Sequence, residues 1–176
     1  MNLRLFVAAE LPDDVRAALA AWRPDDPALR AVDTAGVHVT LCFLGWVDEA
    51  RVDAVGAAAM ACAAPVGELA VREGLWLPPR RPRVLTIALD DPDGRLGAVQ
   101  QAVVEAMVAV AGHEPEARPF LPHVTVARVR QGARPRMRGL PEGPRASFAG
   151  EAVTLYRSYL GGGPARYEAV ERAVLA

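Results

Sequence analysis

Two short stretches of the sequence repeat one pattern: residues 38–41 read HVTL, and residues 123–126 read HVTV. The chain has three histidines and five threonines, so a Thr two places after two of the histidines would arise by chance in roughly one of several hundred sequences. Both stretches are rich in β-branched residues, which favour strands, and side chains alternate between the two faces of a strand. The spacing therefore predicts that each His and its Thr share one face. The opposite face should carry Val39, Leu41 and Phe43 in the first stretch, and Val124 and Val126 in the second.

The surroundings of the two stretches repeat as well, with a period of about 80 residues that is typical of a duplicated lobe. In the first half the expected elements are a strand over residues 3–10, a helix from Pro12, a loop over residues 23–36 and a strand over residues 37–44 that Gly45 ends. In the second half they are a strand over residues 83–89, a helix from Asp91 to Gly112, a loop and a strand over residues 123–129. We therefore expect one domain over residues 1–176, made of two lobes.

Further elements are expected outside the repeat. They are a helix from Asp48 to about Ala64, a strand over residues 68–77, and two tail strands over residues 152–160 and 166–174 joined by a turn at residues 161–164. The apolar face of the first helix should comprise Val15, Ala18, Leu19 and Trp22. Residues 132–147 should form the most mobile loop.

The charge of the chain is nearly balanced, at a formal net value of −1, which argues against indiscriminate coating of nucleic acid. Residues 118–141 nevertheless contain six arginines and no acid, and Arg80, Arg81 and Arg83 form a second cluster. Such clusters fit a phosphate-bearing partner. All 20 basic residues are arginine, so no lysine is present to act in a P-loop, as a Schiff base or as a covalent carrier of a nucleotide.

The location expected for the chain is the cytoplasm. No apolar run reaches the roughly 18 residues of a membrane span, and the first ten residues are too short and too soon acidic for a signal peptide. Cys42 and Cys62 lie among apolar neighbours and should remain buried thiols in a reducing compartment.

Two opposed His-Thr pairs suit phosphoryl chemistry. In-line displacement at phosphorus needs a base on the attacking oxygen and an acid on the leaving oxygen, on opposite sides of the phosphate. His38 and His123 can supply both roles, and the hydroxyls of Thr40 and Thr125 can donate to the non-bridging oxygens. His113 follows a helix-ending glycine and is expected to cap the helix or lie at the surface. A zinc site is not expected, because positions four apart on a strand, such as His38 and Cys42, are about 13 Å apart.

Several segments carry a resemblance to a known family. They are RLFVA at residues 4–8 with the following ELP, HVTLCFLG at residues 38–45, RPFLPHVTVAR at residues 118–128, and Ser158 with Tyr167 in the tail. With these segments the sequence resembles the two-histidine phosphoesterases of the RNA 2′,3′-cyclic phosphodiesterase group, also called 2′-5′ RNA ligase-like proteins. The resemblance implies an α+β fold with two lobes related by a pseudo-two-fold axis, antiparallel sheets lining a central cleft and helices outside.

The resemblance also implies the reaction and the roles of individual residues. RNA ends with a 2′,3′-cyclic phosphate would be hydrolysed to 2′-phosphate ends without a metal or other cofactor. His38 would protonate the leaving 3′-oxygen, His123 would activate water, and Arg128 would bind phosphate. Without lysine, 2′-5′ ligation could only be the ATP-independent reverse of hydrolysis. We expect a monomer with no obligate protein partner and no membrane association.

Two positions disagree with a simple transfer from the family. Strict alternation places Arg128 on the face opposite His123, so either the strand bends after Thr125 or Arg128 reaches around its end. Cys42 stands where relatives often carry a basic or polar residue, which would alter affinity if that position contacts substrate.

Two other functions fit the same residues. One is a non-catalytic RNA-binding module that uses the arginine-rich stretch, although permanently charged groups would serve binding better than two histidines. The other is a hydrolase of a small cyclic phosphate or nucleotide. Phe6, Trp46 and Trp76 are candidates to stack on a base, but aromatic residues near strands more often belong to the core.

Overall fold

The computed structural model describes residues 1–161, 163 and 165–175, which form two antiparallel sheets and three α-helices. The strands are β1 (Asn2–Glu10), β2 (Leu29–Ala31), β3 (Val39–Asp48), β4 (Glu68–Leu77), β5 (Val84–Asp90), β6 (His123–Val129), β7 (Ser147–Ala149), β8 (Ala152–Tyr159) and β9 (Arg166–Val174). The α-helices are α1 (Asp13–Ala21), α2 (Val52–Ala61) and α3 (Arg95–Ala111), and two short 3-10 turns are η1 (Thr34–Gly36) and η2 (Glu49–Arg51).

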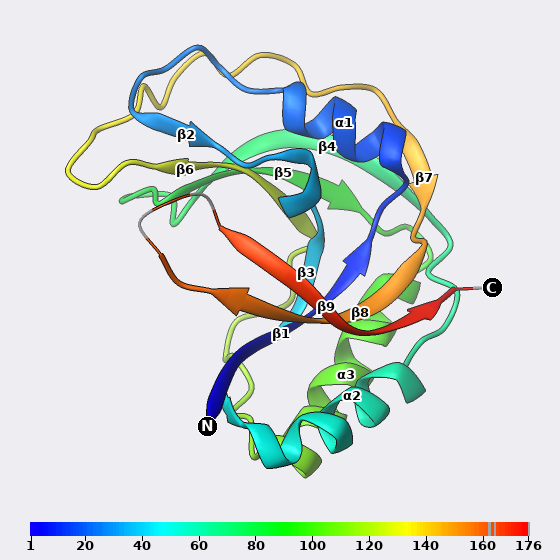
Figure 1. Cartoon of the computed structure of the whole chain (residues 1–176). Helices are drawn as coiled ribbons and strands as arrows, with labels where there is room; N and C mark the ends of the chain where they lie inside the picture. Colours follow the sequence, from blue (N-terminus) through cyan, green and yellow to red (C-terminus); the bar gives the residue numbers. More distant parts are fainter. Residues whose placement is uncertain (162, 164, 176) are drawn as a thin grey trace.

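The two sheets have matching strand orders. The first sheet runs β3-β1-β8-β9, and the second runs β2-β6-β5-β4-β7, with all neighbours antiparallel. Without β2, the strands correspond one to one, so that β3 and β1 match β6 and β5. The expected α+β fold of two pseudo-symmetric lobes with antiparallel sheets is therefore confirmed (Figure 1).

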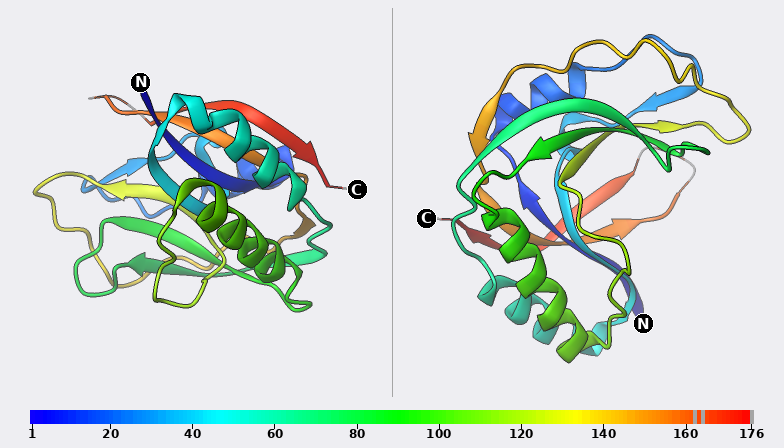
Figure 2. Two further views of the ribbon diagram at one scale, coloured as in Figure 1. Left: turned by 90° about the horizontal axis from the view of Figure 1, so that it is seen from below. Right: turned by 180° about the vertical axis from the view of Figure 1, so that it is seen from behind.

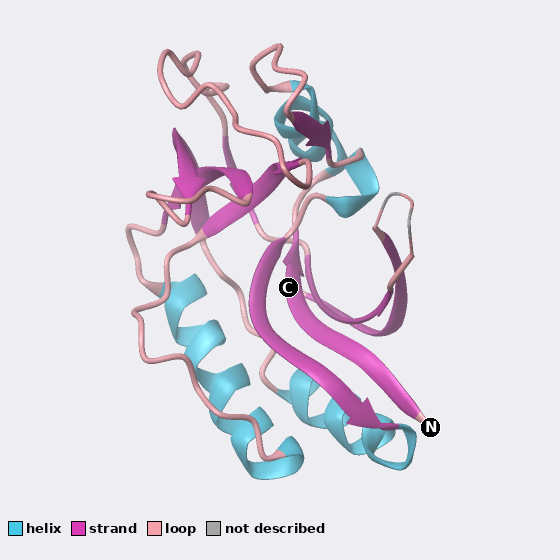
Figure 3. Ribbon diagram, turned by 90° about the vertical axis from the view of Figure 1, so that its left-hand side faces the viewer, coloured by secondary structure: helices cyan, strands magenta, loops and turns pink. Residues whose placement is uncertain are grey.

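The helices cover the outer side of the two sheets (Figures 1 and 2). Helix α1 lies over the second sheet, and the ring of Trp22 just after it meets Gly74 of β4, where a side chain would not fit. Helices α2 and α3 pack together and contact the first sheet through β3, β8 and β9. The helix that follows the first strand of each half, α1 or α3, thus covers the sheet of the other half. The strands lie between helices at opposite ends of the molecule (Figure 3).

The apolar stripes predicted for the helices largely form the core. Leu96, Val99, Val103 and Met107 of α3 are buried, and Gly112 ends the helix at φ +66°. The backbone N–H of His113 donates to the Met107 carbonyl, so His113 belongs to the helix cap as expected. In α1 the prediction was wrong for Ala18, which is exposed while Ala20 is buried, because Val15 and Leu19 orient the short helix.

Three local expectations need correction. The loop predicted over residues 23–36 contains β2 and η1. Strand β3 continues past Gly45 to Asp48, because the positive φ of Gly45 forms an irregularity in the pairing with β1 instead of ending the strand. The loop predicted over residues 132–147 ends one residue earlier, because Ser147 begins β7. In the predicted turn at residues 161–164, Gly162 and Pro164 lie outside the described residues.

Candidate active site

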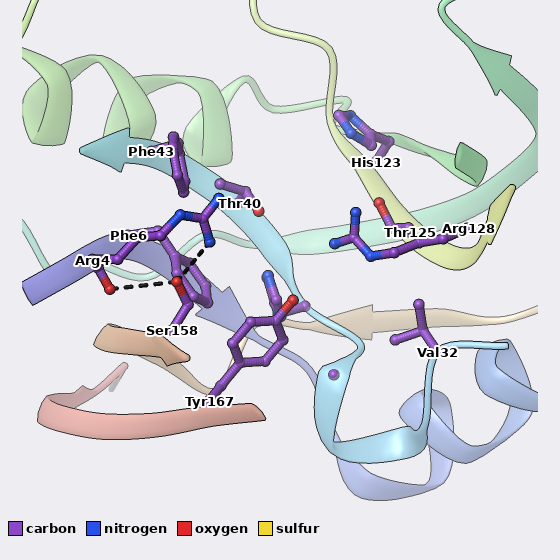
Figure 4. Close-up of a pocket in the computed structure, with 12 residues that line it drawn as sticks. Arg4, Phe6, Val32, Thr40, Phe43, His123, Thr125, Arg128, Ser158 and Tyr167 are labelled. Atoms are coloured by element: carbon purple, nitrogen blue, oxygen red, sulfur yellow. Dashed lines mark hydrogen bonds between the residues drawn. The ribbon is translucent and has the colours of Figure 1, made fainter. Parts of the chain in front are cut away.

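One cavity of about 280 Å³ between the two sheets collects all five residues that sequence reasoning selected. His38 directly precedes β3 and Thr40 lies at its start. His123, Thr125 and Arg128 belong to β6. Figure 4 shows Thr40 and the three residues of β6 on facing sides of the cavity. The remaining lining residues are Arg4, Phe6, Val32, Gly36, Phe43, Ser158 and Tyr167.

A β-bulge in β6 explains how Arg128 reaches this cavity. The pairing with β5 shifts between Thr125 and Ala127, so Val126 is an extra residue without its own partner. Val126 and Ala127 are both buried, and the next residue, Arg128, returns to the face of Thr125. The alternation conflict is therefore resolved by a local irregularity just after Thr125, and Arg128 does not reach around the strand end.

The same bulge occurs in β3. There the pairing with β1 shifts between Thr40 and Cys42, which leaves Leu41 as the extra residue. Phe43 consequently lines the cavity, and the prediction that it lies on the opposite face was wrong. The register makes Phe43 the counterpart of Arg128, since Phe43 pairs with Phe6 of β1 and Arg128 with Val84 at the equivalent place in β5.

Cys42 does not contact the cavity. The bulge turns it into the core, where burial raises the pKa of its thiol to about 12. A basic or polar residue is therefore not needed at Cys42 to hold a ligand. Cys42 and Cys62 are both free thiols as expected, but Cys62 is only half-buried.

Each imidazole is oriented by the backbone carbonyl two residues before it. Nδ1 of His123 lies 2.7 Å from the Leu121 carbonyl oxygen, and a ring nitrogen of His38 donates to the Gly36 carbonyl. When Nδ1 of His123 carries the proton, Nε2 is free to accept one. The two lobes thus repeat the orientation of the histidine as well as its sequence.

His38 is also fixed by aromatic rings. Its imidazole stacks on Phe6 with ring centroids 4.9 Å apart, and Phe6 stacks on Tyr156 at 5.2 Å. The ring of Tyr167 meets His38 edge-on at 5.5 Å. These contacts leave the imidazole little freedom to rotate.

A carboxylate supports this aromatic stack from behind. Glu10 accepts hydrogen bonds from Thr154 at 2.6 Å and from the Tyr156 hydroxyl at 2.8 Å, and Arg172 forms an ion pair with it at 2.9 Å. Burial opposes ionisation of Glu10, but these three partners lower its pKa. Tyr156 is thereby anchored beneath Phe6, with a pKa raised to about 12 by burial and by Glu10.

The pKa of His38 is lowered to about 4, first by burial and then by the positive charge of Arg128. The carbonyl of Gly36 and the charge of Glu10 act in the opposite direction but do not compensate. The protein groups around the cavity therefore favour neutral His38. A bound anion beside Arg128 would favour the protonated form.

Arg4 is a second arginine of the cavity. The sequence pointed to it only as part of the segment RLFVA, which resembles the family. Its Nη1 donates to Ser158 Oγ at 2.7 Å, and its guanidinium lies over the Phe43 ring at 4.6 Å from the centroid (Figure 4). Arg4 thus places a positive charge beside Phe43, the counterpart of Arg128. In the sequence, the only indication of this role is that Arg4 is a charged residue within an otherwise hydrophobic strand.

The aromatic candidates separate clearly. Phe6 lines the cavity, Trp76 is buried in the core, and Trp46 is 62% exposed and does not line the cavity. Phe43 and Tyr167 are the other aromatic rings of the lining.

Neither a metal-binding cluster nor a membrane-spanning helix occurs among the described residues. No three His, Cys, Asp or Glu side chains among them are close enough to hold a metal ion together. None of the helices they form is long and apolar enough to cross a membrane.

Paired lobes, each with one His-x-Thr motif directed into a shared cavity, are the arrangement expected of the two-histidine phosphoesterases. Residues 11–162 match the family model described as the 2′-5′ RNA ligase superfamily. The chain is 32% identical over 177 residues to the RNA 2′,3′-cyclic phosphodiesterase of Escherichia coli strain K12, which covers 98% of this chain and 96% of that protein. The chain therefore belongs to the 2′-5′ RNA ligase superfamily.

Other relatives agree with this assignment. The RNA 2′,3′-cyclic phosphodiesterase of Bacillus subtilis is 24% identical over 172 residues, or 94% of this chain and 92% of that protein. The crystal structure of E. coli LigT complexed with 3′-AMP superposes with a TM-score of 0.80 at 27% identity and covers 99% of both chains. The same protein complexed with phosphate gives a TM-score of 0.76.

Proposed function

We propose that this protein is an RNA 2′,3′-cyclic phosphodiesterase that opens the cyclic phosphate at RNA ends and leaves a 2′-phosphate. The observation that carries the proposal is the convergence of two backbone-oriented histidines, each with a threonine two residues on, in one cavity between the lobes. Relatives similar over nearly the whole chain bear the name of this activity. The crystal structure of LigT with 3′-AMP supports a cavity that accepts a nucleotide with a phosphate at its ribose.

His123 acts as the base in this reaction. With Nδ1–H donating to the Leu121 carbonyl, Nε2 accepts the proton of a water molecule that attacks phosphorus. His38 acts as the acid on the other side of the phosphate and donates its proton to the leaving 3′-oxygen. The bond between phosphorus and the 3′-oxygen breaks as the bond to water oxygen forms, so the phosphate remains on the 2′-oxygen.

The remaining cavity residues stabilise the charge of the phosphate. Thr40 and Thr125 donate hydrogen bonds to the non-bridging oxygens, where negative charge increases in the transition state. Arg128 and Arg4 add a guanidinium on each side of the cavity. Phe6 and Tyr167 hold His38 in position, and no step requires ATP.

The anionic substrate also supplies the protonation state that the acid needs. Burial and then the charge of Arg128 lower the pKa of His38, and a phosphate beside Arg128 offsets the second of these causes. His38 takes up a proton as substrate binds, and then donates it during bond cleavage. We place this reaction in the cytoplasm and assign it to the monomer.

The experiment that tests the proposal is incubation of the protein with an RNA oligonucleotide that ends in a 2′,3′-cyclic phosphate. Matched reactions use His38→Ala, His123→Ala, and His113→Ala, a histidine outside the cavity. We expect turnover by the wild type and His113→Ala, with losses of roughly 10²–10⁴-fold or more in the two cavity variants. Tight binding without turnover by the wild type would indicate the non-catalytic module, and turnover of cyclic mononucleotides alone would indicate a small-molecule hydrolase.

A further inference from the structure

A second hollow, of about 620 Å³, opens at the end of the five-stranded sheet where β2, β6 and the connection between β4 and β5 meet. Three arginines line it: Arg30 of β2, Arg83 just before β5 and Arg130 just after β6. Its other lining residues are Pro82, Val129, Gln131, Gly132 and Ala133. Arginine is thus the only charged residue type among the residues that line this hollow.

Paired arginines link the lining of the hollow to that of the catalytic cavity. Arg30 and Arg128 are direct partners in the β2–β6 ladder, and residues opposite each other in an antiparallel pair project from the same face. Arg30 also donates to the Gly163 carbonyl at 3.3 Å, so its side chain extends toward the connection between β8 and β9 in the other sheet. Arg130 follows Arg128 by two residues. Arg30 and Arg130 therefore lie next to Arg128 along the two paired strands, and both line the hollow.

These arginines are available to an anion. The ion pairs found in the described part of the chain do not involve Arg30, Arg83 or Arg130. Arg30 and Arg130 each make one hydrogen bond to a backbone carbonyl, and a guanidinium has further donors. A surface with three unneutralised guanidinium groups in a hollow suits closely spaced phosphates.

The other arginines of the acid-free stretch lie elsewhere. The segment that carries Arg134, Arg136 and Arg138 runs past α1 and β2 (Figure 1), where the Arg136 N–H donates to Asp26 and the Trp22 indole donates to the Glu142 carbonyl. None of the three lines the catalytic cavity or the hollow. Sequence proximity to Arg128 is therefore a poor guide to which arginines lie on the path of a bound chain.

We propose that the hollow formed by Arg30, Arg83 and Arg130 binds the phosphodiester backbone of the nucleotides on the 5′ side of the reacting RNA end. The inference rests on the proposed function, because it takes the terminal cyclic phosphate to lie beside Arg128. A chain whose 3′ end is held there must leave the cavity through its 5′-linked phosphate, and Arg30 and Arg130 are the adjacent cations. The hollow thus favours oligonucleotides over cyclic mononucleotides, and its contacts are to backbone and not to bases.

The test compares two triple variants with the same change in charge. One replaces Arg30, Arg83 and Arg130 by Ala, and the control replaces Arg134, Arg136 and Arg138 by Ala. The first should raise KM for a cyclic-phosphate-ended oligonucleotide about tenfold or more, with kcat and the hydrolysis of a 2′,3′-cyclic mononucleotide nearly unchanged. The control should change neither. Lysine at Arg30, Arg83 and Arg130 should restore most of the affinity, because point charges also bind phosphate.

A binding measurement separates this inference from the proposed function. Fluorescence anisotropy of a labelled oligonucleotide with a 2′-phosphate end, followed against salt concentration, does not depend on turnover. Loss of three phosphate contacts should reduce the slope of log Kd against log salt by about 2.

Equal losses in the two triple variants would overturn the inference, because they would reflect net charge alone. So would equal losses on oligonucleotide and mononucleotide, or wild-type binding that does not depend on RNA length. If Arg30→Ala weakens the fold because the contact with Gly163 is lost, the double variant Arg83→Ala, Arg130→Ala is compared with the control in its place. Failure to hydrolyse either substrate would reject the proposed function. The anisotropy comparison would still show whether the hollow binds the RNA backbone.

Discussion

His38 and His123 are not equivalent, although the sequence around them is nearly the same. His38 is stacked on Phe6 and enclosed by Tyr167, whereas His123 is held mainly by its bond to the Leu121 carbonyl. Burial and the positive charge of Arg128 lower the pKa of His38 to about 4. The asymmetry of the surroundings provides the physical basis for two different roles.

An activated substrate should distinguish the acid from the base. A ribose 3′-oxygen leaves poorly without a proton, but an aryl oxygen does not need one. With an activated aryl phosphodiester that the cavity accepts, His38→Ala should recover much of its lost rate, whereas His123→Ala should remain inactive because water still needs a base. Steady-state kinetics of both variants on both substrates is the measurement, and recovery of His123→Ala alone would reverse the assignment.

The pKa of His38 should depend on the ligand. In the free protein its imidazole should titrate near pH 4, well below the usual 6.5, so it is neutral at pH 6. A phosphate-bearing product should raise that pKa, so binding at pH 6 should be accompanied by proton uptake. NMR titration of labelled histidines, with and without a 2′-nucleotide, measures both values. A His38 pKa that binding leaves unchanged or lowers further would contradict the role of His38 as acid.

At the level of strands, the two bulges decide which side chains enter the cavity. The positions of His38, Thr40, His123 and Thr125 could be predicted from alternation, because the bulges come after each Thr. Phe43 was placed on the wrong face, and Arg128 could be placed only by resemblance, because the extra residues Leu41 and Val126 leave no mark in the pattern of apolar residues. A bulge is fixed by pairing with the neighbouring strand, which the local sequence does not contain.

Gly45 should be needed for the irregular pairing of β1 with β3. Its φ of +71° is costly for a residue with a Cβ, so Gly45→Ala should lower the free energy of unfolding by about 1–2 kcal/mol. The control, Gly97→Ala, lies in α3, where the added Cβ meets only Asp91 Oδ2 at 3.6 Å, and should raise the stability by about 0.5–1 kcal/mol. Urea unfolding of both variants tests the contrast; equal effects would argue against the left-handed conformation of Gly45.

At the scale of the whole molecule, the repeat of strand, helix, loop and strand was sufficient to predict two related lobes. The strands over residues 68–77, 123–129 and 166–174 were predicted with the observed bounds. The exchange of α1 and α3 between lobes was not predictable, because an amphipathic helix shows which face it buries but not the sheet that covers it. The cavity lies between the sheets, so both halves of the repeat must fold together to form it.

Catalysis should not depend on a metal ion. In the proposed mechanism the two imidazoles transfer protons, and Thr40, Thr125 and Arg128 stabilise charge, which are the tasks that a metal would otherwise perform. Initial rates on a cyclic-phosphate-ended RNA should therefore be the same, within about twofold, with and without EDTA. Loss of turnover in EDTA that one particular metal restores would contradict this expectation.

In the proposed mechanism His123 directs water at phosphorus while the bond to the 3′-oxygen breaks. Hydrolysis of a cyclic-phosphate-ended oligonucleotide in ¹⁸O-labelled water, followed by mass spectrometry and separation of the product isomers, tests it most directly. The product should be a 2′-phosphate that carries one ¹⁸O atom. A 3′-phosphate, or a phosphate without the label, would contradict it.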